Sequence, residues 1–156
     1  MRVKLRVKAR GSGKSEELVV LVNGGAESPR PCLVVDPSIA EKLGLWPLRE
    51  AEIYYVEEAS TTSSALLLRD AVVLELVGEG GEVLSSIVAD LAVQEGLTEP
   101  LITDVTIDEL GIQVLSFGRG LWRHKADRPG VVRRSARRRQ DPRKGHTPYF
   151  PACKGV

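Results

Sequence analysis

The residues of this 156-residue chain that are best suited to chemistry follow directly after an apolar run. Residues 18–22 are all Leu or Val, and they lead into Asn23, Gly24, Gly25 and Ala26. Asn23 is the only asparagine in the sequence. Its side-chain amide can donate and accept hydrogen bonds, but it has no usable basicity near neutral pH. The segment therefore predicts a binding loop rather than a general acid or base.

A plain hairpin turn is the alternative interpretation of Asn23 and Gly24. Asn-Gly between strands is the usual signature of a type I′ turn. Gly25 and the prolines at 29 and 31 fit it poorly, because no alternating strand begins straight after the turn. Asn-Gly is also prone to deamidation, which would place an aspartate at position 23.

Charge is distributed very unevenly along the chain. Every charged residue from 2 to 14 is basic, residues 15–118 hold nineteen carboxylates against four cations, and twelve basic residues follow from 119 onward. A basic segment of this kind can hold phosphates without reading bases, since it lacks interleaved aromatic residues. A solvated tail is the alternative. The candidate nucleic-acid contacts are Arg133, Arg134, Arg137, Arg138 and Arg139.

Composition sets further bounds. Few amides beside abundant Glu and Arg are typical of proteins from hot environments. Cys32 and Cys153 lie far apart with no Cys-x-x-Cys pair, so we predict no metal site, no cofactor and a reducing cytoplasm. His124 and His146 have no partner pattern and are expected to be exposed. No apolar run approaches the ~20 residues that a membrane span needs.

Alternating and β-branched segments predict a mostly β domain with two short helices. Asp36 is expected to cap a helix that ends at Gly44, and Thr103 a helix over 104–110 that ends at Gly111. Trp46 lies just beyond the first helix. Both it and the second tryptophan, at 122, are expected to pack against the core. The predicted strands cover residues 2–9, 17–22, 32–35, 51–57, 66–68, 71–77, 83–93 and 112–117.

The order and spacing of these elements resemble the single-lobe, retropepsin-like aspartic proteases, including archaeal relatives that carry Asn-Gly-Gly. In that family a strand enters Asp-Thr/Ser-Gly-Ala. A strand, a short helix ending in Leu-Gly-Leu, a flap hairpin and a second apolar element with a short helix follow. Here residues 18–26, 34–45 and 100–112 occupy the corresponding places. The resemblance covers roughly residues 2–117.

The resemblance implies a closed antiparallel β-barrel over residues 1–123 and a homodimer with Asn23 near its two-fold axis. Residues 124–156 form a basic tail, which from Lys125 onward is expected to be largely disordered. Three departures affect function. Asn23 replaces the catalytic aspartate, Gly24 replaces the hydroxyl residue that ties the two loops together, and Thr103 replaces a glycine of the second element.

These departures predict a catalytically degenerate domain that binds a peptide or protein segment at residues 23–26. Two alternatives stay open. One is an active aspartic-type peptidase that uses another carboxylate, with Glu27 as the candidate acid or with Asn23 deamidated. The other is an accessory nucleic-acid-binding protein that acts through its basic tail.

Overall fold

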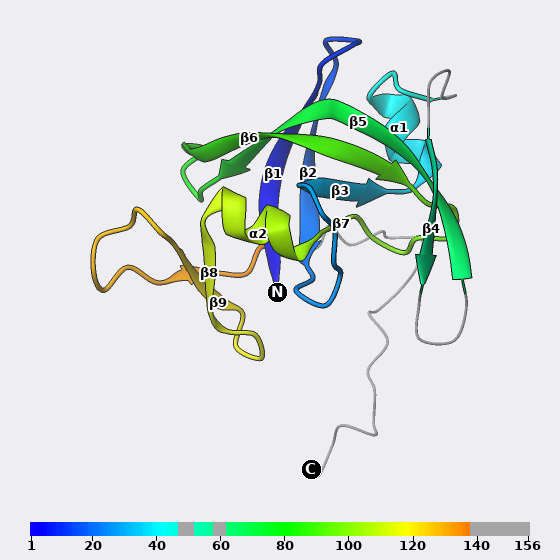
Figure 1. Ribbon diagram of the computed structural model, residues 1–156. Helices are drawn as coiled ribbons and strands as arrows, with labels where there is room; N and C mark the ends of the chain where they lie inside the picture. Colours follow the sequence, from blue (N-terminus) through cyan, green and yellow to red (C-terminus); the bar gives the residue numbers. More distant parts are fainter. Residues whose placement is uncertain (47–51, 58–61, 138–156) are drawn as a thin grey trace, which may run out of the picture.

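A computed structural model of the protein describes residues 1–46, 52–57 and 62–137 (Figure 1). The fold is mostly β, with 48% of residues in strands and 11% helical, and it contains a closed six-stranded barrel and two short helices. The predicted fold class is therefore confirmed.

The main sheet has seven strands in the order β1-β2-β7-β3-β6-β5-β4. Pairing of β1 with β5 closes six of them into the barrel and leaves β4 outside, at the sheet edge. The strands are β1 (Arg2–Ala9), β2 (Ser15–Val22), β3 (Cys32–Val35), β4 (Glu52–Glu57), β5 (Thr62–Val77), β6 (Val83–Val93) and β7 (Leu101–Ile102).

Strand β1 shows why this sequence builds a barrel wall. Val3, Leu5 and Val7 are fully buried, and the basic residues between them point to the outer surface. Because side chains alternate along a strand, a one-residue slip would bury this basic set. Carboxylates of the neighbouring strands pair with it. Lys4 Nζ, for example, lies 3.2 Å from the Glu17 carboxylate.

The shortest strand of the main sheet, β7, brings the loop that begins at Asn23 close to the helix that follows Thr103. Strand β7 lies between β2 and β3, parallel to the first and antiparallel to the second (Figure 1). The loop over residues 23–31 leaves the end of β2, and helix α2 (Asp104–Leu110) begins just after β7. The loop and the first turn of the helix therefore meet at the same end of the barrel.

Strand β5 is one continuous strand where the sequence predicts two. Its first half pairs with β4 in a hairpin, and its second half pairs with β1. Its register against β6 shifts between Leu68 and Val72, and Asp70 adopts a left-handed conformation with φ of 48°. The bulge bends the strand without ending it, so that one strand serves both the hairpin and the barrel.

The helix signals are largely confirmed. Helix α1 (Pro37–Lys42) is capped by Asp36, whose Oδ1 accepts a 3.0 Å hydrogen bond from the amide of Ile39. Thr103 stands at the N-cap position of α2, but its side chain makes no capping hydrogen bond. Gly111 ends α2 in the left-handed conformation, as predicted.

The expectation of disorder from Lys125 onward is wrong for residues 125–137. These residues turn back and add β10 (Arg133–Arg134) to β8 (Ile112–Ser116) and β9 (Leu121–His124). The three strands form the C-terminal sheet. Polar contacts hold the segment: the Arg133 guanidinium makes two 2.8 Å hydrogen bonds to Asp127 and lies over the Trp122 ring. Residues 138–156 lie outside the described residues.

The expectation that His124 is exposed is also wrong, since only 4% of it is accessible. Its Nε2 lies 3.1 Å from the carbonyl oxygen of Leu110, and its Nδ1 accepts a 3.2 Å hydrogen bond from the amide of Ala126. Both ring nitrogens are thus satisfied inside the fold. Trp122 is buried in the core and Trp46 packs against it, as expected. His146 lies outside the described residues.

No helix in the described ranges is long and apolar enough to cross a membrane. Cys32 is buried as a free thiol, and Cys153 falls in the undescribed C-terminal part of the chain.

The Asp127–Arg133 pair predicts how the fold responds to acid. The hydrogen bond from the Arg133 guanidinium holds the pKa of the Asp127 carboxyl well below its usual range. A lowered folded-state pKa adds stability above the unfolded pKa of about 4, and that stability is lost as the pH falls. Asp127→Asn should therefore lower the melting temperature near neutral pH, and its deficit relative to wild type should shrink below about pH 4.

Thermal unfolding followed by circular dichroism between neutral pH and about pH 2 measures this deficit. Asp108→Asn is the control, because it removes the same charge from an exposed site on α2. An Asp127→Asn deficit that stays constant with pH would contradict the prediction.

Candidate functional site

The segment that begins at Asn23 is a backbone turn closed by the asparagine itself. Asn23 Oδ1 accepts a 3.1 Å hydrogen bond from the amide of Gly25, and the Asn23 carbonyl accepts one of 3.1 Å from the amide of Ala26. The Asn23 amide donates to the carbonyl of Ile102 in β7 at 3.3 Å. The turn is thus fixed to the end of β2 and to β7.

The alternative of a type I′ hairpin is wrong. That turn needs positive φ at both central residues, and neither Gly24 nor Gly25 has it. In addition, β2 pairs with β1 and β7 rather than with the strand that follows the turn. The turn belongs to a longer connection, residues 23–31, which we call the Asn23 loop.

The Asn23 loop is tied to the first turn of α2. The carbonyl of Ala26 accepts a 2.9 Å hydrogen bond from the amide of Asp104. In return, Asp104 Oδ1 accepts from the amide of Ser28 at 3.2 Å and from that of Val105 at 2.7 Å. Asp104 is thus a carboxylate beside the loop that our sequence analysis missed. Asp104 directly follows Thr103, the predicted helix cap, and an acidic residue in the first turn of a helix is the sequence signal that would have indicated a role here.

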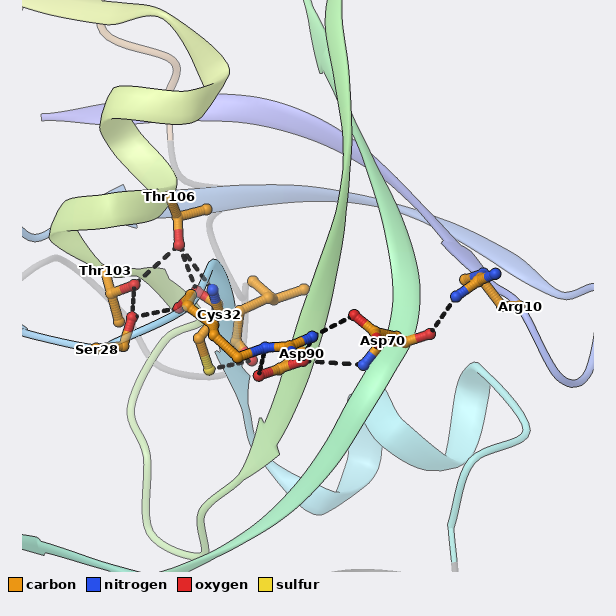
Figure 2. Close-up of polar contacts among 9 residues, drawn as sticks. Arg10, Ser28, Cys32, Asp70, Asp90, Thr103 and Thr106 are labelled. Atoms are coloured by element: carbon orange, nitrogen blue, oxygen red, sulfur yellow. Dashed lines mark hydrogen bonds and ion pairs between the residues drawn. The ribbon is translucent and has the colours of Figure 1, made fainter.

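Three side-chain hydroxyls connect the loop, α2 and β3, and we call them the hydroxyl chain. Ser28 Oγ lies 2.6 Å from Thr103 Oγ1, which lies 2.8 Å from Thr106 Oγ1 (Figure 2). Thr106 Oγ1 accepts from the amide of Cys32 at 2.8 Å and donates to the Cys32 carbonyl at 3.1 Å. Thr106 is fully buried and Thr103 is 4% exposed. The side chain at position 103 therefore links the two elements.

The far end of the Asn23 loop is anchored to the bend in β5. Arg30 Nε lies 3.3 Å from Asp90 Oδ2, and its guanidinium also contacts the Asp70 carboxylate. Asp90, which is 3% exposed, accepts a 2.9 Å hydrogen bond from the amide of Asp70 (Figure 2). A buried carboxylate is costly unless it is paired, so this contact holds the loop and the bend together.

The loop offers hydrogen-bond donors rather than a base. Asn23 Oδ1 already accepts a hydrogen bond from the Gly25 amide. The Nδ2 group of Asn23 has no partner among the described residues, so it is the part of the side chain that can donate hydrogen bonds to a ligand. Glu27 is exposed, and its side chain makes no hydrogen bond or ion pair with a described residue. Burial raises the pKa of the Cys32 thiol to about 12, with a further contribution from Asp90, so Cys32 stays protonated and is no nucleophile.

No group of three or more His, Cys, Asp or Glu side chains within the described ranges could hold a metal ion. A shallow hollow of about 770 Å³ lies between the start of α1 and residues 95–98. Its lining includes Asp36 and Glu95 but no residue of the Asn23 loop. The loop is therefore placed apart from this hollow.

The structure separates the predicted nucleic-acid contacts into two kinds. The Arg133 guanidinium is occupied by Asp127, and it also lies 3.6 Å from Glu82. Arg134 and Arg137 are exposed, and neither side chain has a partner among the described residues. Arg133 is therefore a structural residue, and the prediction that it contacts nucleic acid is not supported. Arg138 and Arg139 lie outside the described residues.

The chain matches no known protein-family model and no curated protein.

The hydroxyl chain predicts a sharp difference between two substitutions of Thr106. Thr106→Val keeps the shape but leaves the buried amide of Cys32 without its partner, and it leaves the Cys32 carbonyl with only the long 3.5 Å hydrogen bond from the Thr103 amide. Such a loss costs about 1–3 kcal/mol per unsatisfied group. Thr106→Ser keeps the hydroxyl and is the matched control, so it should cost no more than about 1.5 kcal/mol, the scale of one lost methyl group. Urea unfolding measures both, and equal losses would refute the role of the hydroxyl.

Proposed function

We propose that the protein is a retropepsin-like domain that has lost peptide hydrolysis and binds an extended peptide or protein segment as a homodimer. One observation carries the proposal. The loop that corresponds to the catalytic loop is held by β7, α2, β5 and β6, yet it presents an amide where hydrolysis needs a carboxylate. The support of the loop has been kept while its acid–base group is absent.

The chemistry of Asn23 supports the loss of hydrolysis. An aspartic dyad works because two carboxylates share one proton and one of them takes a proton from water. The Asn23 amide oxygen is occupied by the Gly25 amide, and the amide nitrogen can only donate. A water molecule beside Asn23 would therefore meet a donor rather than a base.

The same geometry supports peptide binding. The free Nδ2 of Asn23 suits an acceptor such as a peptide carbonyl oxygen. Strand β4 has β5 on one side, and no described strand pairs with its other edge. An extended segment that adds to this edge would gain main-chain hydrogen bonds, which is the usual mode of strand addition. The β4–β5 hairpin corresponds to the flap in the resemblance.

The proposal includes a dimer because the Asn23 loop of a single chain does not line the hollow near α1. A second chain would therefore have to supply the other wall of a peptide-binding cleft at this loop. In the proposed dimer, a second copy of the loop faces the first across a two-fold axis and completes the walls of a cleft. The cleft then carries two asparagine amides in place of two aspartates. Because both amides lie near the two-fold axis, they would donate side by side to the middle of one bound segment.

A peptidase that uses Glu27 is less well supported. The Glu27 side chain is exposed and makes no hydrogen bond or ion pair with a described residue that would orient its carboxylate. Catalysis by a general base depends on a fixed geometry, and a displacement of about 1 Å is already costly. The Asn23 loop holds position 23 far more firmly than it holds the side chain at position 27.

The test compares wild type with Asn23→Asp on a mixed peptide library between about pH 3 and pH 8. Only the aspartate variant should cleave, with highest activity at acid pH, where a carboxylate pair shares one proton. Asn23→Asp/Glu27→Gln is the matched control and should cleave equally well. Cleavage by wild type that Glu27→Gln abolishes would overturn the proposal and support the peptidase alternative.

Binding is tested separately with wild type, Asn23→Ala and Glu27→Ala against peptides selected from a displayed library. Asn23→Ala should weaken binding about tenfold, the effect of one lost hydrogen bond of ~1.4 kcal/mol, while Glu27→Ala leaves it unchanged. Sedimentation velocity should show a dimer. A strictly monomeric protein, or equal binding by all three, would contradict the proposed cleft.

A further inference from the structure

The C-terminal sheet has a one-sided charge that the proposed peptide cleft does not explain. Residues 112–137 contain seven Arg or Lys residues and a single carboxylate, Asp127. Arg133 occupies that carboxylate with two hydrogen bonds of 2.8 Å each. The remaining cations of the segment have no carboxylate partner among the described residues.

Cations of the barrel are arranged differently. On β1, Lys4 pairs with Glu17, and both Arg6 and Lys8 pair with Glu75. The first residue of the strand, Arg2, makes two hydrogen bonds to another carboxylate at 2.8 and 2.9 Å. The barrel thus neutralises its own basic strand, whereas the C-terminal sheet leaves its positive charge available to a partner.

Unpaired arginines and an exposed ring gather at one end of this sheet. Phe117 and Arg119 lie in the turn from β8 to β9, and 61% of Phe117 is exposed. Arg134 lies opposite Leu121, the first residue after that turn. The amide of Ser135 donates to the carbonyl of Gly120, so residues 134 and 135 lie beside the turn.

We propose that this end of the C-terminal sheet binds single-stranded nucleic acid. Phe117 stacks on a base, and the guanidiniums of Arg119 and Arg134 hold the flanking phosphates. Guanidinium groups match phosphate oxygens in planar, two-point contacts, and an exposed ring gives a stacking surface that unpaired bases can reach. Bases inside a duplex are already stacked, so the site favours a single strand.

The distribution of apolar side chains favours nucleic acid over an anionic membrane. Leu115 and Phe117 lie at one end of the sheet, while Val131 and Val132 precede β10 and lie toward the other end. Membrane adsorption needs a continuous apolar face to enter the lipid. A single exposed ring beside unpaired arginines needs only one base and its phosphates.

The experiment measures fluorescence anisotropy of the full-length protein with a labelled single-stranded oligonucleotide at several salt concentrations. Phe117→Ala should weaken binding about tenfold and Phe117→Trp should restore it, since base stacking needs a ring. Arg119→Ala/Arg134→Ala should weaken binding and reduce the slope of log K against log salt by about 1.4. Matched duplex should bind more weakly than the single strand.

Lys14→Ala/Lys42→Ala is the matched control, because it removes two exposed cations near the far end of β1, where Gly44 approaches Ser12 and Lys14. It should leave the affinity and the salt slope nearly unchanged. Equal effects of the two double variants would show that only net charge matters and would overturn the proposal.

Three further results would also overturn the proposal. One is an absence of binding at about 50 mM salt. Another is binding that Phe117→Ala leaves intact, which would assign the contact to residues outside this site. The third is capture by anionic vesicles with no binding of the oligonucleotide. Thermal unfolding of each variant confirms that it is folded, and the Phe117→Trp rescue separates stacking from a general loss of structure.

Discussion

The insertion of β7 between β2 and β3 is the constraint on which the rest of the structure depends. This strand has two residues, and it pairs with both neighbours. It seals the barrel between β2 and β3, accepts the amide of Asn23, and leads within two residues into α2. Without it, the Asn23 loop and the helix would have no reason to meet, because about 80 residues separate them in sequence.

Two polar networks then hold the Asn23 loop in place. The hydroxyl chain satisfies the backbone of Cys32 inside the fold, and the pair formed by Arg30 and Asp90 secures the other end of the loop. Buried polar groups stabilise one arrangement because each lost partner leaves an unsatisfied group behind. The loop is therefore pre-organised, which lowers the entropic cost of binding a ligand.

The two proposed binding surfaces are joined through the start of β1. The amide of Arg2 donates to Ser135 Oγ at 2.8 Å, and its carbonyl accepts from Ala136. One residue earlier, the carbonyl of Met1 accepts from the amide of Val22, next to the Asn23 loop. Residues 135 and 136 thus lie beside the start of β1, and these contacts hold this part of the C-terminal segment against the barrel.

Local patterns in the sequence determined the elements. Alternation predicts β1 with its bounds, Asp36 predicts the cap of α1, and Gly111 predicts the end of α2, because each signal acts within a few residues. Asn23 also stands out locally by its type and position, and the binding site that it predicts stays a prediction. What the sequence does not determine is the partner that each polar side chain meets.

Tertiary structure alone decided those partners. Ser28 and Thr103 are 75 residues apart, and Arg30 and Asp90 are 60 apart, so no local period connects them. In the sequence, His124 and Arg133 look like members of a solvated basic tail. In the structure, His124 is buried against the carbonyl of Leu110, and Arg133 pairs with Asp127 and lies over the Trp122 ring. Hydrogen bonds and burial depend on distances in space, which only the assembled tertiary structure sets.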